Sequence, residues 1–194
     1  RPNALQQFLS VPAGDAVYFP SRAHIPAGVP ADDPAGSSTA RVRAKIDACL
    51  AQGITTFDHA DIYGLYTCEG LFGRALADAP SLRDQMEIVT KCGINVPCEH
   101  RPGVRVHHYD ASAAAIERCV DRSLRELRTD RIDVLLVHRP DWLTSAEDTA
   151  RGLLGVIKSG KVRSVGVSNY NPHQFALLAR YLGHARHVGA GHYA

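Results

Sequence analysis

The chain has 194 residues, 45% of them hydrophobic and 22% charged, which is the usual balance of a globular protein and suits one domain. A formal net charge of +2 gives no electrostatic argument for binding nucleic acid or an anionic membrane, and no apolar run approaches the roughly 20 residues of a membrane-spanning helix. The 5 cysteines form no C-x-x-C pair, so we expect reduced thiols and a cytoplasmic protein. The sequence does not indicate the oligomeric state.

The apolar pattern predicts strands that alternate with helices. We expect helices from the cap at Ser37 and Ser38, over residues 68–79, around 116–127 and around 150–157, and strands at 54–60, 86–91, 132–138 and 162–168. A last helix should begin at Asn171 as N-cap, with Pro172 and Gln174 in its first turn. This order predicts a parallel sheet with crossover helices. The strands are spaced like the units of a (β/α)8 barrel, apart from an insertion at 94–110.

Polar residues stand at the carboxyl ends of the predicted strands. They are Asp58, His59, Lys91, His138, Ser168 and Asn169, and Tyr63 follows in the first loop between a strand and a helix. In a parallel barrel these strand ends share one face, and that face carries the active site. The sequence therefore predicts that four separate strands bring polar groups to one place.

These residue types suit the reduction of a carbonyl group. A Lys ammonium within about 4–6 Å of a phenol favours the phenolate, so we expect Lys91 to lower the pKa of Tyr63 from about 10 and to make it a usable proton donor. Asp58 can keep Lys91 charged despite burial, and His138 can donate a hydrogen bond to a substrate oxygen. Because no nucleophile or metal cage is evident, a bound cofactor is the natural source of hydride.

Other readings of these residues remain open. His138 could be a satisfied core histidine, Ser168 and Asn169 could only lead into the next helix, and Asp61 could cap its strand end. We expect His59 to face away from the site. A metal-dependent hydrolase using Asp58, His59 and His138 is a weaker alternative. The Cys and His residues at 98–108 have spacings that fit no standard zinc site, so we predict no metal.

Four motifs in order resemble the aldo-keto reductase superfamily, most closely its bacterial predicted oxidoreductases. They are residues 57–64 (FDHADIYG), 88–91 (IVTK), 135–140 (LLVHRP) and 160–169 (GKVRSVGVSN). The resemblance implies a TIM barrel that binds NADPH and reduces aldehydes or ketones to alcohols. It implies that Tyr63 is the general acid, that Lys91 and Asp58 set its pKa, and that His138 orients the carbonyl. Ser168 and Asn169 would hold the nicotinamide carboxamide.

The resemblance covers about residues 37–183, so we expect an irregular segment at 1–36, a partial barrel of the first five or six β/α units at 37–183, and a tail at 184–194. A complete barrel takes roughly 250 residues. Residue 1 is Arg and the only methionine is Met86, which suggests a processed, trimmed or partial chain. Two prolines in residues 23–30 argue against a central strand there. The runner-up reading is a non-catalytic relic or interaction module that lacks a complete cofactor site.

Overall fold

A computed structural model describes residues 17–18 and 35–184, which are built around a sheet of parallel strands in the order β1-β2-β3-β6-β7. The strands are β1 (Val17–Tyr18), β2 (Thr56–Asp58), β3 (Glu87–Cys92), β6 (Ile132–Val137) and β7 (Val162–Val167). Their spatial order follows the chain, so each crossover joins two neighbouring strands, as in a (β/α)8 barrel. The predicted strand positions are confirmed to within a few residues.

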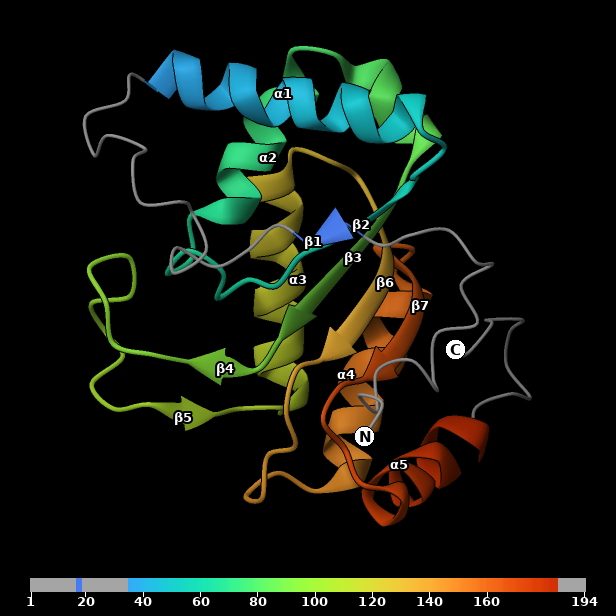
Figure 1. Ribbon diagram of the computed structural model, residues 1–194. Helices are drawn as coiled ribbons and strands as arrows, with labels where there is room; N and C mark the ends of the chain where they lie inside the picture. Colours follow the sequence, from blue (N-terminus) through green and yellow to red (C-terminus); the bar gives the residue numbers. More distant parts are fainter. Residues whose placement is uncertain (1–16, 19–34, 185–194) are drawn as a thin grey trace.

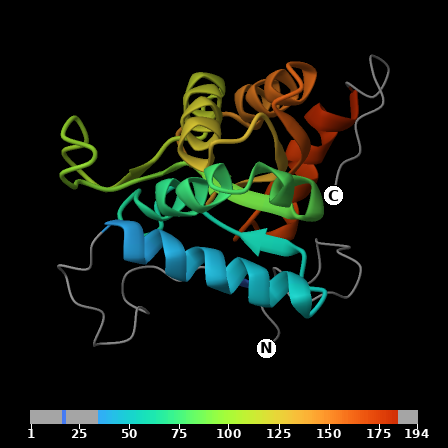
Figure 2. The same cartoon turned by 90° about the horizontal axis from the view of Figure 1, so that it is seen from above.

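The helices lie in an arc along one side of this sheet (Figures 1 and 2). They are α1 (Ala35–Ala51), α2 (Cys68–Ala77), α3 (Ala113–Leu127), α4 (Ala146–Lys158) and α5 (Pro172–His184), with a 3-10 helix η3 (Pro80–Gln85) before β3. Each α-helix packs against the next one along the chain. This is the expected arrangement of a partial α/β barrel, with its helices outside and its strands within.

The insertion predicted as a loop at 94–110 contains a small hairpin. Strands β4 (Ile94–Asn95) and β5 (His108–Tyr109) pair antiparallel, and the hairpin projects away from the helices and the sheet in both views (Figures 1 and 2). It begins directly after β3, at the carboxyl end of the sheet.

The two predicted helix caps have different outcomes. The cap of α5 is confirmed, because Asn171 Oδ1 accepts a hydrogen bond from the Gln174 amide at 2.9 Å and Gln174 Oε1 accepts from the Asn171 amide at 3.0 Å. The cap at Ser37 and Ser38 is wrong, since α1 already begins at Ala35. Serine is only moderately unfavourable inside a helix, so two serines do not force a helix to start.

Only part of the predictions for the ends of the chain can be compared with the structure. Strand β1, which pairs with β2, was not expected. Its neighbours in sequence at 23–30, where we expected no strand, lie outside the described residues, and so does the tail beyond residue 184. The segment boundaries at 36 and 183 therefore stay predictions.

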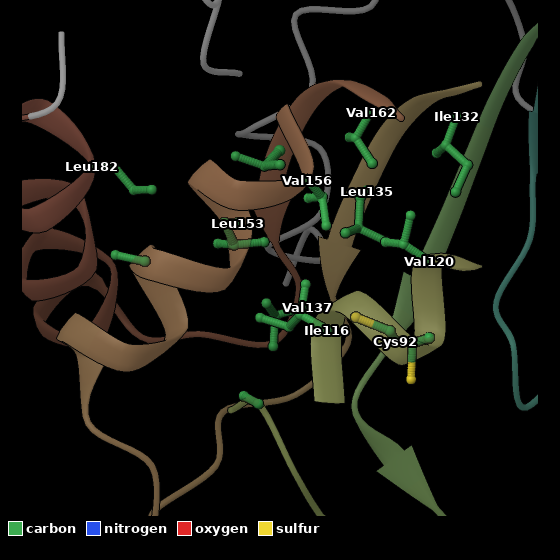
Figure 3. Close-up of a cluster of buried hydrophobic side chains, with 14 of the residues drawn as sticks. Cys92, Ile116, Val120, Ile132, Leu135, Val137, Leu153, Val156, Val162 and Leu182 are labelled. Atoms are coloured by element: carbon green, nitrogen blue, oxygen red, sulfur yellow. The ribbon is translucent and has the colours of Figure 1, made fainter. Parts of the chain in front are cut away.

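The main apolar core fills the space between the sheet and helices α3, α4 and α5 (Figure 3). Its central side chains are almost fully buried and come from the inner faces that the helical and strand periodicity predicted: Ile116, Val120, Ile132, Leu135, Val137, Leu153, Val165 and Leu178. A second cluster lies beneath α1 and α2 and includes Ile46, Phe57, Phe72 and Ile88. Together these clusters hold in place the strands whose carboxyl ends carry the polar residues.

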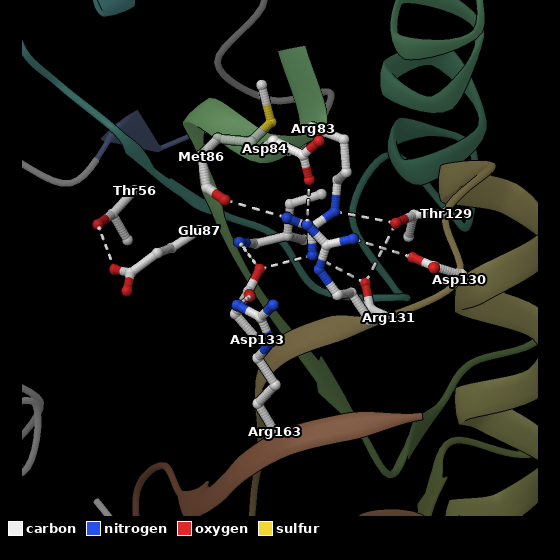
Figure 4. A network of polar contacts seen from close by, with 11 residues as sticks. Thr56, Arg83, Asp84, Met86, Glu87, Thr129, Asp130, Arg131, Asp133 and Arg163 are labelled. Carbon is white, nitrogen blue, oxygen red and sulfur yellow. Dashed lines mark hydrogen bonds and ion pairs between the residues drawn. The ribbon is translucent and has the colours of Figure 1, made fainter. Parts of the chain in front are cut away.

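A buried polar network holds the opposite, amino-terminal ends of β3, β6 and β7 (Figure 4). Arg83 donates to the Asp133 carboxylate at 2.6 Å, and its other N–H groups donate to Thr129 Oγ1 and to the carbonyl oxygens of Met86 and Arg131. The same carboxylate accepts from the Ile88 amide and from Arg163 on β7, both at 2.9 Å. One aspartate on β6 thus ties together the strands on either side of it.

His59 is buried against the second apolar cluster, through its contact with Phe72. Its ring is fully buried and meets the ring of Phe72 edge-on, with 4.5 Å between centroids. Burial, and then the positive charge of Lys91, lower the pKa of His59 to about 3. We expected His59 to face away from the site, and its ring lies against Phe72 of α2.

Helices α2 and α3 approach so closely at Gly73 that a side chain there should destabilise the fold. A Cβ atom would overlap the carbonyl oxygen of Glu126 and lie 2.7 Å from the carbonyl carbon of Leu127, and backbone atoms cannot easily yield. We expect Gly73→Ala to lower the free energy of unfolding by about 1–3 kcal/mol in urea denaturation. The control Gly155→Ala, whose Cβ would meet only the tip of Glu117, should instead be neutral or stabilising by up to about 1 kcal/mol.

The buried His59 should make stability depend on pH. Its folded pKa lies below the ordinary 6.5, so between pH 6.5 and 3 the unfolded chain binds more protons, and stability is lost as the pH falls. We expect His59→Leu to flatten the fall of the unfolding free energy by up to about 1.4 kcal/mol per pH unit below pH 6.5. Urea titrations from pH 7 to 4.5 measure this slope. Ile88→Leu should lower stability without changing the slope, and an unchanged slope in His59→Leu would contradict the assignment.

Candidate active site

Backbone hydrogen bonds continue past the strand ends and bring the predicted site residues into register. The amide of His59 donates to the carbonyl of Val89 at 2.8 Å, and that of His138 donates to the carbonyl of Cys92 at 2.9 Å. On the other side, the Ser168 amide donates to the carbonyl of Val137 at 2.8 Å. The carboxyl ends of β2, β3, β6 and β7 therefore form one continuous edge, as predicted.

Lys91 is the most deeply buried charged side chain of this edge, with 1% of its surface exposed. Its ammonium donates to both carboxylate oxygens of Asp58, at 2.8 and 2.7 Å, and to the carbonyl oxygen of His59 at 3.0 Å. Burial raises the pKa of Asp58 above its usual value, although the charge and hydrogen bonds of Lys91 act in the opposite direction. Lysine and aspartate thus form a buried ion pair between neighbouring strands.

Tyr63 completes this group from the loop after β2. Its hydroxyl accepts a hydrogen bond from the Lys91 ammonium at 3.3 Å, and the ammonium lies 5.1 Å from the centre of its ring. The prediction that the phenol and the ammonium meet is confirmed. The predicted direction of the pKa shift is wrong: burial, and then the charges of Asp58 and Cys68, raise the pKa of Tyr63 to about 12. Asp58 offsets the charge of Lys91, so the loss of water dominates.

His138 lies beside Tyr63 at the end of β6. The two rings meet nearly edge to face, with 6.1 Å between centroids. Burial, followed by the charges of Lys91 and Arg139, lowers the pKa of His138 to about 4, so the imidazole is neutral at pH 7 and has one N–H to donate. Its Nδ1 is buried and has no hydrogen-bond partner within the part of the chain that the structure describes.

Ser168 and Asn169 reach the same edge from β7. The Asn169 amide nitrogen donates to the carbonyl oxygen of His138 and to Ser168 Oγ, both at 2.9 Å. Asn169 has a left-handed backbone with φ of 62°, which asparagine tolerates better than most residues. The Asn169 side chain therefore joins the backbone of His138 to the Ser168 hydroxyl, a connection that the sequence pattern did not reveal.

The structure also shows buried supports that the sequence reading missed or misread. Asp61 does not simply cap its strand, because its carboxylate pairs with Arg122 of α3 at 2.6 Å. Glu69 of α2 accepts hydrogen bonds from Thr90 Oγ1 at 2.6 Å and from Ser123 Oγ at 3.0 Å. Partners so far apart in the chain leave no local pattern, so only the buried position of a charged residue could have suggested them.

This constellation can deliver a proton to a bound oxygen. Tyr63 stays protonated at neutral pH, and the phenol is still a far stronger acid than an alcohol, so it can protonate an alkoxide-like oxygen. The neutral imidazole of His138 can donate a hydrogen bond to the same oxygen. Among the residues described, no group of three His, Cys, Asp or Glu side chains is placed to hold a metal ion. No helix within that same part is long and apolar enough to cross a membrane.

Comparison with known proteins finds oxidoreductases among the relatives of this chain. The chain is 55% identical over 146 residues to a 6-dehydroglucose reductase of Agrobacterium fabrum and 52% identical over 145 residues to the uncharacterized oxidoreductase YcsN of Bacillus subtilis. Each match covers 75% of this chain but only 49% and 48% of those relatives, so the chain spans about half the length of the curated relatives it matches.

Solved structures give the same picture. A glycerol dehydrogenase from Gluconobacter oxydans superposes with a TM-score of 0.66 at 34% identity, over 77% of this chain and 43% of that enzyme. An aldo/keto reductase from Klebsiella pneumoniae in complex with NADP and acetate superposes with a TM-score of 0.59 at 26% identity, over 86% of this chain and 48% of that one. Residues 31–186 match the profile of the Aldo/keto reductase family. The chain therefore belongs to the aldo/keto reductase family and has the fold of its barrels over the first β/α units.

Proposed function

We propose that this chain carries the catalytic residues of an NADPH-dependent reductase that converts an aldehyde or ketone into an alcohol. The observation that supports this most directly is the hydrogen bond of 3.3 Å between the Lys91 ammonium and the Tyr63 hydroxyl, with the Asp58 carboxylate on the other side of the ammonium. The group combines a proton donor, a fixed positive charge and a neutral imidazole at one strand edge, which is the set that carbonyl protonation requires.

Each residue then has a distinct task. Tyr63 gives its proton to the carbonyl oxygen as that oxygen becomes negative. The Lys91 ammonium, held by Asp58, stabilises the phenolate left behind, and it can do so without reorganising because its position is already fixed. His138 donates a hydrogen bond that orients the carbonyl oxygen toward Tyr63.

The residues at the end of β7 fit the amide group of a nicotinamide. Ser168 Oγ accepts from Asn169 and keeps its own proton to donate, so the pair offers both a donor and acceptors to a carboxamide. When bound, the cofactor supplies the hydride. Ser168 and Asn169 would hold it beside His138, to whose carbonyl oxygen Asn169 is bonded.

The substrate is a small carbonyl compound, and the relatives suggest which one to test. The Agrobacterium relative is a 6-dehydroglucose reductase by name, as is one from Novosphingobium aromaticivorans that is 38% identical over 154 residues. A sugar aldehyde of this kind is therefore the first substrate to assay. Reduced thiols agree with a cytoplasmic location, which stays a prediction.

A non-catalytic role is the second candidate, and the observation behind it is the coverage of about half of each curated relative. The same assay separates the two. If the purified and folded chain neither binds NADPH nor oxidises it with any aldehyde, the catalytic proposal fails for this chain.

Tyr63→Phe should abolish most of the turnover. The substitution removes the proton donor while keeping the ring, and general acid catalysis typically contributes about 10²–10⁴-fold. We expect kcat for NADPH oxidation with 6-dehydroglucose or simple aldehydes to decrease by a factor of about 10²–10⁴. The absorbance of the reduced nicotinamide measures this rate. Tyr109→Phe, which removes a hydroxyl from the projecting hairpin, should leave kcat unchanged. Equal rates for Tyr63→Phe and the unmodified chain would remove Tyr63 from this role.

Ser168→Ala should weaken cofactor binding more than it slows the chemical step. Loss of one hydrogen bond of about 0.5–1.5 kcal/mol raises the Kd for NADPH by about two- to tenfold. Fluorescence titration of the folded chain with NADPH measures this without turnover. Ser159→Ala, at the far end of α4, removes a hydroxyl of the same kind and should leave the Kd unchanged. A Kd equal to that of the unmodified chain would contradict the assignment of Ser168.

A further inference from the structure

The turn that follows Tyr63 is strained. Gly64, Leu65 and Tyr66 all have left-handed backbones, with φ of 60°, 54° and 71°. For residues other than glycine this conformation costs roughly 1–2 kcal/mol each, and it is rarely adopted by bulky side chains. Leu65 is also 43% exposed, so its own burial does not offset this cost. Some other contact must hold the turn in place.

One such contact is the hydrogen bond that Thr67 Oγ1 donates to the carbonyl oxygen of Gly64 at 2.7 Å. The others come from the side chain of Tyr66. Its hydroxyl donates to the carbonyl oxygen of Ile94 at 3.0 Å and accepts from the amide of Val96, also at 3.0 Å. The guanidinium of Arg101 lies 4.2 Å from the centre of its ring, within range of a cation–π interaction. The residue is buried, with 9% of its surface exposed.

The anchor point lies just after β3, the strand that carries Lys91. Ile94 and Val96 come directly after β3, in the first strand of the hairpin and the residues beyond it. Tyr66 therefore joins the loop that contains Tyr63 to the backbone segment that follows Lys91 and β3. The phenol itself is close to this turn, because the carbonyl oxygen of Tyr63 accepts from the amides of Thr67 and Cys68, both at 3.3 Å.

We propose that Tyr66 is a positioning residue for the proton donor: its hydroxyl anchors the strained turn at 64–66 to the segment after β3 and so keeps the Tyr63 hydroxyl against Lys91. This inference rests on the proposed function only in naming Tyr63 as the proton donor. The geometric part, that the Tyr66 hydroxyl decides where the Tyr63 phenol lies, stands independently of any reaction. Strain held in place beside a reactive group is a known means of preorganising it.

A plain packing role for Tyr66 makes a different prediction. Packing and the contact with Arg101 need only the ring, which Tyr66→Phe retains, whereas both anchoring hydrogen bonds need the hydroxyl. The variant also leaves the Ile94 carbonyl and the Val96 amide without their partner. Tyr66→Phe therefore separates the two roles, and Tyr109→Phe is a control that removes a tyrosine hydroxyl from β5 of the hairpin.

The first test follows the Tyr63 phenol by nuclear magnetic resonance in a chain labelled at the tyrosine ζ-carbon, with its signal assigned by Tyr63→Phe. In the unmodified chain a pKa of about 12 leaves the phenol protonated at pH 10.5. If Tyr66→Phe releases the turn to solvent, the pKa should move toward the ordinary value of about 10, so that most of the Tyr63 signal is phenolate at that pH. Circular dichroism at pH 10.5 shows that each variant is still folded.

The second test is kinetic. Misplacing the donor by about 1 Å can cost about a hundredfold in rate, so we expect Tyr66→Phe to lower kcat by about 10–100-fold while the KM for NADPH changes less than twofold. Leu65→Asn in the Tyr66→Phe background should recover part of the lost kcat, because asparagine adopts the left-handed conformation more readily than leucine. If Tyr66→Phe alone does not fold, the double variant takes its place in both tests.

The outcomes distinguish this inference from the proposed function. A Tyr66→Phe chain whose Tyr63 signal at pH 10.5 and whose kcat equal those of the unmodified chain would overturn the positioning role. If the unmodified chain shows no turnover at all, the proposed function is overturned. The resonance measurement would still decide whether Tyr66 positions Tyr63.

Discussion

The ion pair of Lys91 and Asp58 is the interaction on which the rest of the site depends. Burying a charge costs several kcal/mol unless it is paired and hydrogen-bonded, and this ammonium is satisfied by a carboxylate, a backbone carbonyl and a phenol. These partners come from β2 and the loop that follows it, so the pair fixes β2, β3 and Tyr63 relative to one another. Removing either charge would leave the other buried without compensation.

A second buried ion pair lies at the opposite, amino-terminal ends of the strands. There Arg83 and Asp133 form this pair, and the aspartate also bonds to the backbone of β3 and to Arg163 of β7 (Figure 4). Apolar side chains of β3, β6 and β7 pack in the main core along the same strands (Figure 3). The strands are thus held in register at both ends by directional contacts, while apolar burial provides most of the stabilisation between them.

Preorganisation at the site has a cost in backbone conformation. A run of left-handed residues follows Tyr63, and Asn169 beside His138 is also left-handed. Buried polar contacts offset this cost: Tyr66 binds the backbone after β3, and Asn169 binds Ser168 and the carbonyl of His138. Strained backbone held by buried hydrogen bonds is typical of functional sites, and here it occurs on both sides of the proposed reaction centre.

Local sequence patterns were enough to predict the alternation of strands and helices, the cap at Asn171, and the positions of Asp58, Lys91, His138 and Ser168 at strand ends. These features depend on local periodicity and on the rule that the carboxyl ends of parallel strands lie at one edge of the sheet. Residues close together in the sequence are therefore enough to predict them. The left-handed turn, the partners of Asp61 and Glu69, and the direction in which the pKa of Tyr63 shifts became evident only from the folded structure. Each of these is set by burial and by contacts between residues tens of positions apart, and such contacts leave no periodic trace in the chain.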